Sequence, residues 1–254
     1  MEYELSFLFV SLLIISGIFA GFINTIAGGG SMLTLPALMI LGMPADIANG
    51  TNRVGILLQS TAGARRFHQK GKLEPATIIP TLIPTLSGSL IGSLLASYLP
   101  VVFLKPALLI TMLGMAVIML VRPSVVAPPA GTPTYTLKER PIAWLGLFIA
   151  GLYGGFVQAG VGFILIAALA GGLRYDLVRS NALKMAITVP VTVVALAVYV
   201  LRDQVQWIPG LVLAIGMVIG AMASVQFAIN VPQSVLKWVM FSMVLLVCLA
   251  AFFT

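Results

Sequence analysis

The chain contains two related halves, and each half carries a glycine-rich interruption at the corresponding place. In the first half, Gly17–Asn24 reads GIFAGFIN and is followed by Gly28–Ser31. In the second half, Gly151–Gln158 reads GLYGGFVQ and is followed by Gly162. Two hydrophobic halves with glycine-interrupted segments at matching positions are typical of transporters built from repeats, and the interruptions point to the substrate site.

The match between the halves continues beyond the interruptions. Each interruption is followed by a short apolar stretch and an aspartate, Asp46 in the first half and Asp176 in the second. We expect both aspartates to cap helices. A small polar pair and a cation come next in both halves, as Thr51-Asn52 with Arg53 and as Ser180-Asn181 with Lys184.

The composition is that of a membrane protein. Hydrophobic residues make up 60% of the chain and charged residues 8%, with a mean hydropathy of +1.10, whereas soluble proteins average about 25% charged residues. The hydrophilic connection that separates the halves is 122–140. We therefore expect a first transmembrane repeat at 1–121, a cytoplasmic linker at 122–140 and a second transmembrane repeat at 141–254.

Cysteine and histidine are too few for common metal or disulfide chemistry. Cys248 is the chain's one cysteine and His68 its one histidine, so an intrachain disulfide and a Cys-based metal cluster are excluded. The sequence has no HExxH motif and no acid pair inside an apolar segment. We expect no metal, no cofactor and no enzymatic activity.

Ten apolar segments are expected to form helices. Two of them, 31–44 and 162–173, are shorter than the roughly 20 residues that a helix needs to cross a bilayer core. We expect these two to be halves of broken helices or re-entrant pieces, although glycines beside them could simply allow close helix packing. The other segments are 5–26, 47–64, 74–98, 102–121, 141–160, 177–201, 207–230 and 234–253.

The predicted fold is an all-α polytopic membrane protein. It comprises two homologous inverted repeats of about five transmembrane segments each, with short broken or re-entrant helices after Gly28–Gly30 and near Gly162. The repeats are inverted because an odd number of crossings reverses the second repeat relative to the first.

Positive charge predicts the orientation. If all ten segments cross and the N-terminus is outside, ten cations face the cytoplasm and only Lys105 and Arg202 face outward. If 31–44 and 162–173 turn back instead, the count becomes eight against four, so the positive-inside rule favours the first arrangement and places both termini outside. The cytoplasmic cations are then Arg65, Arg66, Lys70, Lys72, Arg122, Lys138, Arg140, Arg174, Arg179 and Lys237.

Two cations lie inside apolar segments. Arg53 follows Asp46 by seven residues and Lys184 follows Asp176 by eight, which places each about 10–12 Å along its helix. Neither has an acidic residue three or four positions away in its segment. An intramembrane charge is by default a functional candidate, and two cations without a carboxylate suit an anion. The alternative is that both side chains extend back to the membrane interface.

Uncharged polar residues accompany these cations. Asn24 and Gln158 precede the two interruptions, and Ser31 begins the short segment after the first, where a helix N-terminus would favour an anion. The amides could instead form hydrogen bonds between helices. The predicted substrate-binding residues are Arg53, Lys184, Asn24, Ser31, Thr51, Asn52, Gln158, Ser180 and Asn181.

The basic cluster Arg65–Lys72 would resemble a nucleic-acid patch in a soluble protein. Beside two membrane segments we expect it to be a cytoplasmic loop that sets the topology and attracts anions or anionic lipid headgroups. The expected partners are a small anionic substrate and the lipid bilayer, with no nucleic acid. The glycine-rich faces could make a homodimer as readily as an intramolecular contact.

Several of these motifs resemble the sulfite exporter TauE/SafE family. The resemblance lies in Asn24–Ser31 (NTIAGGGS), Pro36, Asn49–Asn52 (NGTN) and the basic loop ending at Lys72. Gly151–Lys184 resembles the second repeat of the family, with a single Gly162 in place of three glycines. The resemblance implies a bacterial inner-membrane permease that exports sulfite, sulfoacetate or related sulfur-containing anions, whereas the residues themselves indicate only an anion.

We therefore predict a secondary transporter that exports a small sulfur-containing oxyanion by alternating access between two repeats. The alternatives are an anion channel, a permease for a non-sulfur organic anion, and a scaffold that transports nothing. Because the sequence places no acid or histidine at membrane depth, the usual proton-relay residues are missing. We expect electrogenic export or weak coupling to another ion.

Overall fold

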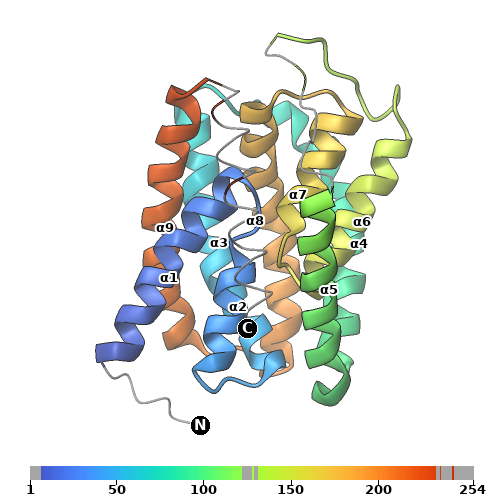
Figure 1. Cartoon of the computed structure of the whole chain (residues 1–254). Coiled ribbons are helices and arrows are strands. Elements are labelled where there is room, and N and C mark those ends of the chain that lie inside the picture. Colours follow the sequence, from blue (N-terminus) through green and yellow to red (C-terminus); the bar gives the residue numbers. More distant parts are fainter. Residues whose placement is uncertain (1–6, 122–127, 129–130, 233–234, 236–241, 243–254) are drawn as a thin grey trace.

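The computed structural model describes residues 7–121, 128, 131–232, 235 and 242 of the chain. Within these residues every regular element is helical (Figure 1), which confirms the predicted all-α class for this part. Nearly all of the predicted segment 234–253 lies outside the described residues. The elements are α1 (Phe7–Ile26), α2 (Ser31–Ile40), α3 (Ala45–Gln69), η1 (Pro75–Thr77), α4 (Ile79–Tyr98), α5 (Val101–Val121), α6 (Ile142–Phe156), α7 (Val161–Ile166), η2 (Ala167–Gly172), α8 (Leu177–Leu201) and α9 (Trp207–Asn230).

Some of the helices are long apolar spans, and others are much shorter. Four of them, α1, α4, α8 and α9, are long and apolar enough to cross a membrane by length and composition. By contrast, α2 has 10 residues, and α7 has 6 before it continues as the 6-residue π-helix η2. The expectation that the second and seventh segments are short helices is therefore confirmed.

The helix α3 is long but polar, and most of it is buried. It has 25 residues and packs against both α8 and α9. It also extends past its predicted end at residue 64, so that Arg65–His68, expected as part of a loop, form its last turns. That expectation was wrong because Ala64, Arg65 and Arg66 are good helix formers, and cations are favourable near a helix C-terminus.

Glycines set the closest helix crossings. The helices α1 and α9 lie along each other, as do α4 and α6 (Figure 1). A methyl group on Gly21 would overlap the Met217 backbone of α9, and one on Gly220 would overlap the α1 backbone. Gly92 and Gly155 occupy similar places where α4 crosses α6. Small residues thus allow backbone-to-backbone packing at both crossings, as in other membrane bundles.

Both predicted interruptions break a helix, and the two breaks touch. The first lies between α1 and α2, where Gly28 has a φ of +95°. The second lies between α6 and α7. A Cβ atom on Gly28 would fall on the backbone of Gly162, and one on Gly162 would fall on Gly28. We call this contact between the two breaks the junction.

The second break lies earlier in the chain than predicted. Gly162 is already the second residue of α7, and the turn before it is made by Gln158 and Gly160, with φ of 67° and 81°. A left-handed backbone favours glycine at position 160, while Gly162 is small because Gly28 lies against it. The predicted break near Gly162 is therefore present at residues 157–160, and Gly160 and Gly162 serve it in different ways.

The loops that carry most of the cations meet at one end of the bundle, the upper end in Figure 1. Arg179 Nη2 lies 2.8 Å from Glu74 Oε1, which joins the first turn of α8 to the loop before η1. Arg174 Nη1 donates to the Tyr135 hydroxyl at 3.3 Å, which joins the linker to the same end. Arg202 follows α8 at the opposite end. The pairing of Arg179 with Glu74 therefore places the start of α8 at the same end of the bundle as the loop before η1.

Candidate functional site

Arg53 caps the C-terminal end of α6. Its Nη1 donates to the carbonyl oxygen of Gly154 at 2.9 Å and to Gln158 Oε1 at 3.1 Å, and its Nη2 donates to the carbonyl oxygen of Gly155 at 2.5 Å. The last carbonyls of a helix lack partners within the helix and together carry about half a negative charge. The guanidinium supplies both the missing donors and the opposite charge.

Tyr199 of α8 holds Arg53 from another side. The guanidinium carbon lies 4.6 Å from the centre of the Tyr199 ring. Asn49 Nδ2 donates to the Tyr199 hydroxyl and to the carbonyl oxygen of Phe156, both at 2.8 Å. Arg53, Tyr199 and Asn49 are all fully buried. Tyr199 was not among the predicted site residues, because nothing in its local sequence signals its contacts with Arg53 and Asn49.

Lys184 makes the reciprocal contact at the end of α1. Its Nζ donates to the carbonyl oxygens of Asn24 and Thr25 and to Asn181 Oδ1, each at 2.8 Å. A lysine ammonium has three donors, so all of them are used. Each cation therefore comes from one half of the chain and caps the broken helix of the other. Both are buried, at 0% and 2% exposure, which rules out the alternative that they extend to the membrane interface.

The positive charges of the two cations at the junction are not fully balanced by negative charge. The salt bridge within the described residues joins Arg179 to Glu74, and neither Arg53 nor Lys184 contacts a carboxylate. Two cations supply two positive charges, and two helix C-termini return about half a negative charge each. About one positive charge remains, and the N-terminus of α2 at Ser31 adds roughly half a charge of the same sign. A small anion is the natural complement of this junction.

Two hydrogen-bond donors on the predicted site residues have no acceptor in the described part of the chain. Arg53 Nε and Asn181 Nδ2 are buried and make no hydrogen bond there. An unsatisfied buried donor costs about 1–3 kcal/mol. A ligand or water that accepts from these groups would recover that cost, so the arrangement is suited chemically to an acceptor-rich anionic group.

A second polar link joins α2 to α3 beside the first break. Thr34 Oγ1 donates to Asn52 Oδ1 at 2.6 Å, and Asn52 Nδ2 donates to Ser31 Oγ at 3.1 Å. All three residues are buried. Ser31 and Asn52, both predicted site residues, therefore lie together, and Thr34 joins them although it was not predicted.

Two of the predicted site residues make contacts elsewhere. Thr51 Oγ1 accepts a hydrogen bond from the Gln206 backbone N–H at 2.9 Å, just before α9. Ser180 Oγ donates to the carbonyl oxygen of Tyr175 at 3.3 Å, just before α8. Both contacts fasten the start of a helix. The remaining predicted residues lie beside the two breaks.

The two matching aspartates differ in their roles. Asp176 is the N-cap of α8, and its Oδ1 accepts from the Arg179 backbone N–H at 3.0 Å, so the expected cap is confirmed. Asp46 lies inside the first turn of α3, after the N-cap Pro44, and its Oδ2 accepts from Gln204 Nε2 at 3.4 Å. The expectation that Asp46 caps the helix with its side chain is wrong, although its charge still favours the helix N-terminus.

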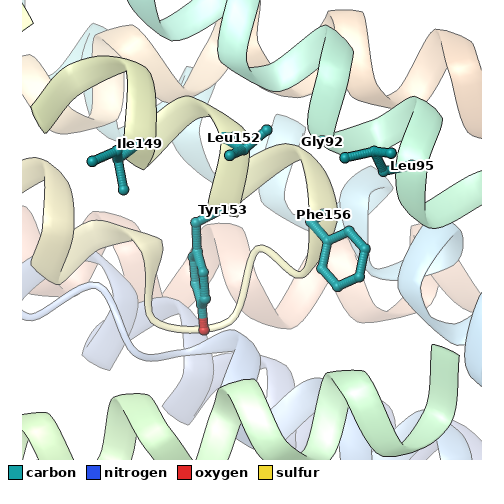
Figure 2. A pocket seen from close by; sticks show the side chains of 6 residues that line it. All are labelled: Gly92, Leu95, Ile149, Leu152, Tyr153 and Phe156. Carbon is teal, nitrogen blue, oxygen red and sulfur yellow. The ribbon is translucent and has the colours of Figure 1, made fainter. Parts of the chain in front are cut away.

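An apolar pocket of about 270 Å³ lies between α4 and α6 (Figure 2). The Tyr153 hydroxyl reaches out of it toward the loop after α6, where it donates to the carbonyl oxygen of Ala159 at 2.7 Å. No charged side chain lines the pocket, so it suits an acyl chain rather than an anion. Its lining residues are Gly92, Leu95, Ile149, Leu152, Tyr153 and Phe156.

Comparison with known proteins gives one consistent group. Residues 13–251 match a family model described as "Sulfite exporter TauE/SafE". "Probable membrane transporter protein ORF9" of Sinorhizobium sp. is 26% identical over 92% of this chain and 88% of its own length. "Probable membrane transporter protein YfcA" of Escherichia coli K12 is 25% identical over 92% and 86%. A "Probable membrane transporter protein" of Haemophilus influenzae is 25% identical over 84% and 82%.

Proposed function

The chain belongs to the sulfite exporter TauE/SafE family of membrane transporters, and from this premise we propose that it exports a small sulfur-containing oxyanion. Sulfite, sulfoacetate and other organosulfonates are the substrate class, and the bacterial inner membrane is the site of transport. The observation that carries the proposal is the pair of buried cations, Arg53 and Lys184, which lie at touching helix breaks without a carboxylate partner.

In this proposal the two halves, 1–121 and 141–254, act as inverted repeats joined by the linker 122–140. The reciprocal capping by Arg53 and Lys184 supports it, as do the similar glycine crossings of α1 with α9 and of α4 with α6. Repeats of this kind rock against each other around a site at their interface. The end of the bundle where most of the cationic loops meet, which we call the basic end, faces the cytoplasm. In this orientation both termini lie outside.

The substrate is bound at the junction in place of some of the present contacts. Arg53 and Lys184 attract the anionic group, and its hydrogen bonds are completed by Asn24, Ser31, Asn52, Gln158 and Asn181. Thr51 and Ser180 contribute by holding α3 and α8 in place.

Substrate binding is linked in this way to conformational change. An anion at the junction competes with the helix carbonyls for the two cations and loosens the ends of α1 and α6. A ligand shifts a conformational equilibrium only as far as it binds one state better than the other. The closed state, with its cations held by carbonyls, has the lower affinity, and the state with released cations has the higher.

A binding panel with the purified protein tests the substrate class. Thermal-shift or calorimetric titration is expected to give signals for sulfite and sulfoacetate and none for acetate, because the junction offers donors in several directions for a tetrahedral or pyramidal oxyanion. Taurine and sulfate complete the panel. Arg202→Ala, at the far end from the basic loops, serves as the matched control and should retain wild-type binding.

Each other result of the panel has a definite meaning. Equal binding of acetate and sulfite would identify a permease for organic anions in general. If none of the anions bound, the sulfur assignment would be wrong, while family membership would stand.

A further inference from the structure

Four polar atoms in the middle of α3 and α8 are buried without a partner in the described part of the chain. They are Gln59 Nε2, Gln59 Oε1, Ser60 Oγ and Thr192 Oγ1, and all three residues have 0% exposure. None of them takes part in the capping contacts at the junction. A glutamine with neither amide atom satisfied is unusual, because buried polar groups nearly always have a partner.

These residues lie between two known contacts of α3 with α8. At one end of the helix pair Arg53 meets Tyr199, and at the other a Cβ on Gly63 would meet Met185, so the helices run antiparallel. Residues seven apart lie on the same face of a helix, two turns from each other. Ser60 is therefore on the face of α3 that carries Arg53.

The matching face of α8 carries Thr192. Thr192 is seven residues after Met185 and seven before Tyr199, and both of those residues contact α3. Ser60 and Thr192 thus lie on facing sides of the two central helices, at levels between the Arg53 and Gly63 contacts. Gln59 is next to Ser60 in the chain.

Gln59 also belongs to a row of polar residues along one face of α3. It is seven residues after Asn52, which bonds Ser31 beside the first break, and seven before Arg66 at the basic end. Successive members of the row are about 10 Å apart along the helix axis. Arg66 Nη2 donates to Gln226 at 3.3 Å, while its Nε is buried without a partner.

Polar groups that are buried this deeply without a hydrogen-bond partner destabilise the folded protein. Each costs about 1–3 kcal/mol, and polar groups that face the interior of a membrane bundle or a water-filled cavity often mark a substrate pathway. Uncharged donors suit a transit site, because a route must bind an ion well enough to admit it and weakly enough to release it.

We propose that Gln59, Ser60 and Thr192 line the route along which the anion passes between Arg53 and Lys184, which lies next to Met185 in α8, with the Gln59 amide donating hydrogen bonds to the anion on the way. The inference rests on the proposed function in taking the ligand to be a small oxyanion. The route itself does not depend on sulfur chemistry. It opens where α3 and α8 now face each other.

Cysteine labelling tests the route without any assumption about substrate. Cys248→Ser removes the chain's one cysteine, and Gln59→Cys or Leu58→Cys is then introduced in membrane vesicles. Leu58 is the matched control, since it is the neighbouring residue and 41% exposed on the outside of the bundle. A small anionic methanethiosulfonate should label Gln59→Cys about tenfold faster than Leu58→Cys, a difference of about 1.4 kcal/mol in activation free energy. Excess sulfoacetate should slow the labelling.

The labelling separates this inference from the proposed function. If Gln59→Cys is labelled no faster than Leu58→Cys while the wild type binds sulfur oxyanions, the route is wrong and the function stands. If Gln59→Cys is labelled quickly while no sulfur oxyanion binds, the route stands and the function is wrong.

A second pair of variants distinguishes a structural role of Gln59 from a role in transport. Gln59→Leu removes two unpartnered polar atoms, so its thermal stability should equal or exceed that of the wild type, whereas its transport rate should fall about tenfold. Gln59→Glu should slow transport further, because its carboxylate repels the anion. Unchanged transport in Gln59→Leu would overturn the proposal.

Discussion

Arg53→Ala is expected to abolish transport and to destabilise the folded protein by at least about 3 kcal/mol, since hydrogen bonds to a charged group contribute about 1.5–3 kcal/mol each. The variant removes the donors to the carbonyl oxygens of Gly154 and Gly155 and to Gln158. It also leaves the end of α6 without a compensating charge. Thermal unfolding in detergent and flux in liposomes measure the two effects separately.

Arg53→Lys distinguishes capping from substrate binding at the same position. A lysine keeps the charge but cannot reproduce the planar fork of the guanidinium. We expect it to restore part of the stability and little of the transport. Arg202→Ala is the control, because Arg202 lies 4.3 Å over the Tyr98 ring at the opposite end from the basic loops and contacts neither break. An Arg53→Ala protein as stable as the wild type would show that Arg53 does not hold α6.

Gly28→Ala is expected to prevent the protein from reaching a stable fold. Its φ of +95° costs an alanine about 1–2 kcal/mol, and the added methyl group would fall on the Gly162 backbone. Overpacking of this kind costs about 1–3 kcal/mol more. Gly162→Ala should have a similar effect, since the contact is mutual. The yield of folded protein and its unfolding temperature give the measurement.

Gly171→Ala is the matched control for the glycines at the junction. It lies in η2, has an ordinary φ, and a Cβ atom there would meet nothing within 4 Å. Its stability should be close to that of the wild type. If Gly28→Ala were equally well tolerated, the two breaks could not be in contact and the junction would have to be abandoned.

The helix positions could be predicted wherever apolar segments end at clear polar boundaries. The segments 177–201 and 207–230 match α8 and α9 in full, because each is a continuous apolar run between charged or polar residues. The end of α3 could not be placed in this way. The apolar run ends before Arg65, but the helix continues to Gln69. It continues because the helix propensity of these residues is still favourable and because Phe67 is buried.

The site could be predicted only as a set of residue types. Arg53 and Lys184 were conspicuous as cations within apolar segments, yet nothing in the local sequence reveals that each reaches the broken helix of the other half. The Arg53 contact with Gly154 spans 101 positions in the chain, and the Lys184 contact with Asn24 spans 160. Tyr199 could not be predicted for the same reason, because its role comes from tertiary contacts with Asn49 and Arg53.

The most direct test of the central claim is sulfite efflux from proteoliposomes under an imposed inside-negative potential, with no pH gradient. The account predicts saturable efflux that rises with voltage, since the potential contributes about 2.3 kcal/mol per charge per 100 mV, and that is lost in Arg53→Ala. Efflux that required a proton gradient while the voltage was held constant, or that persisted in Arg53→Ala, would contradict it.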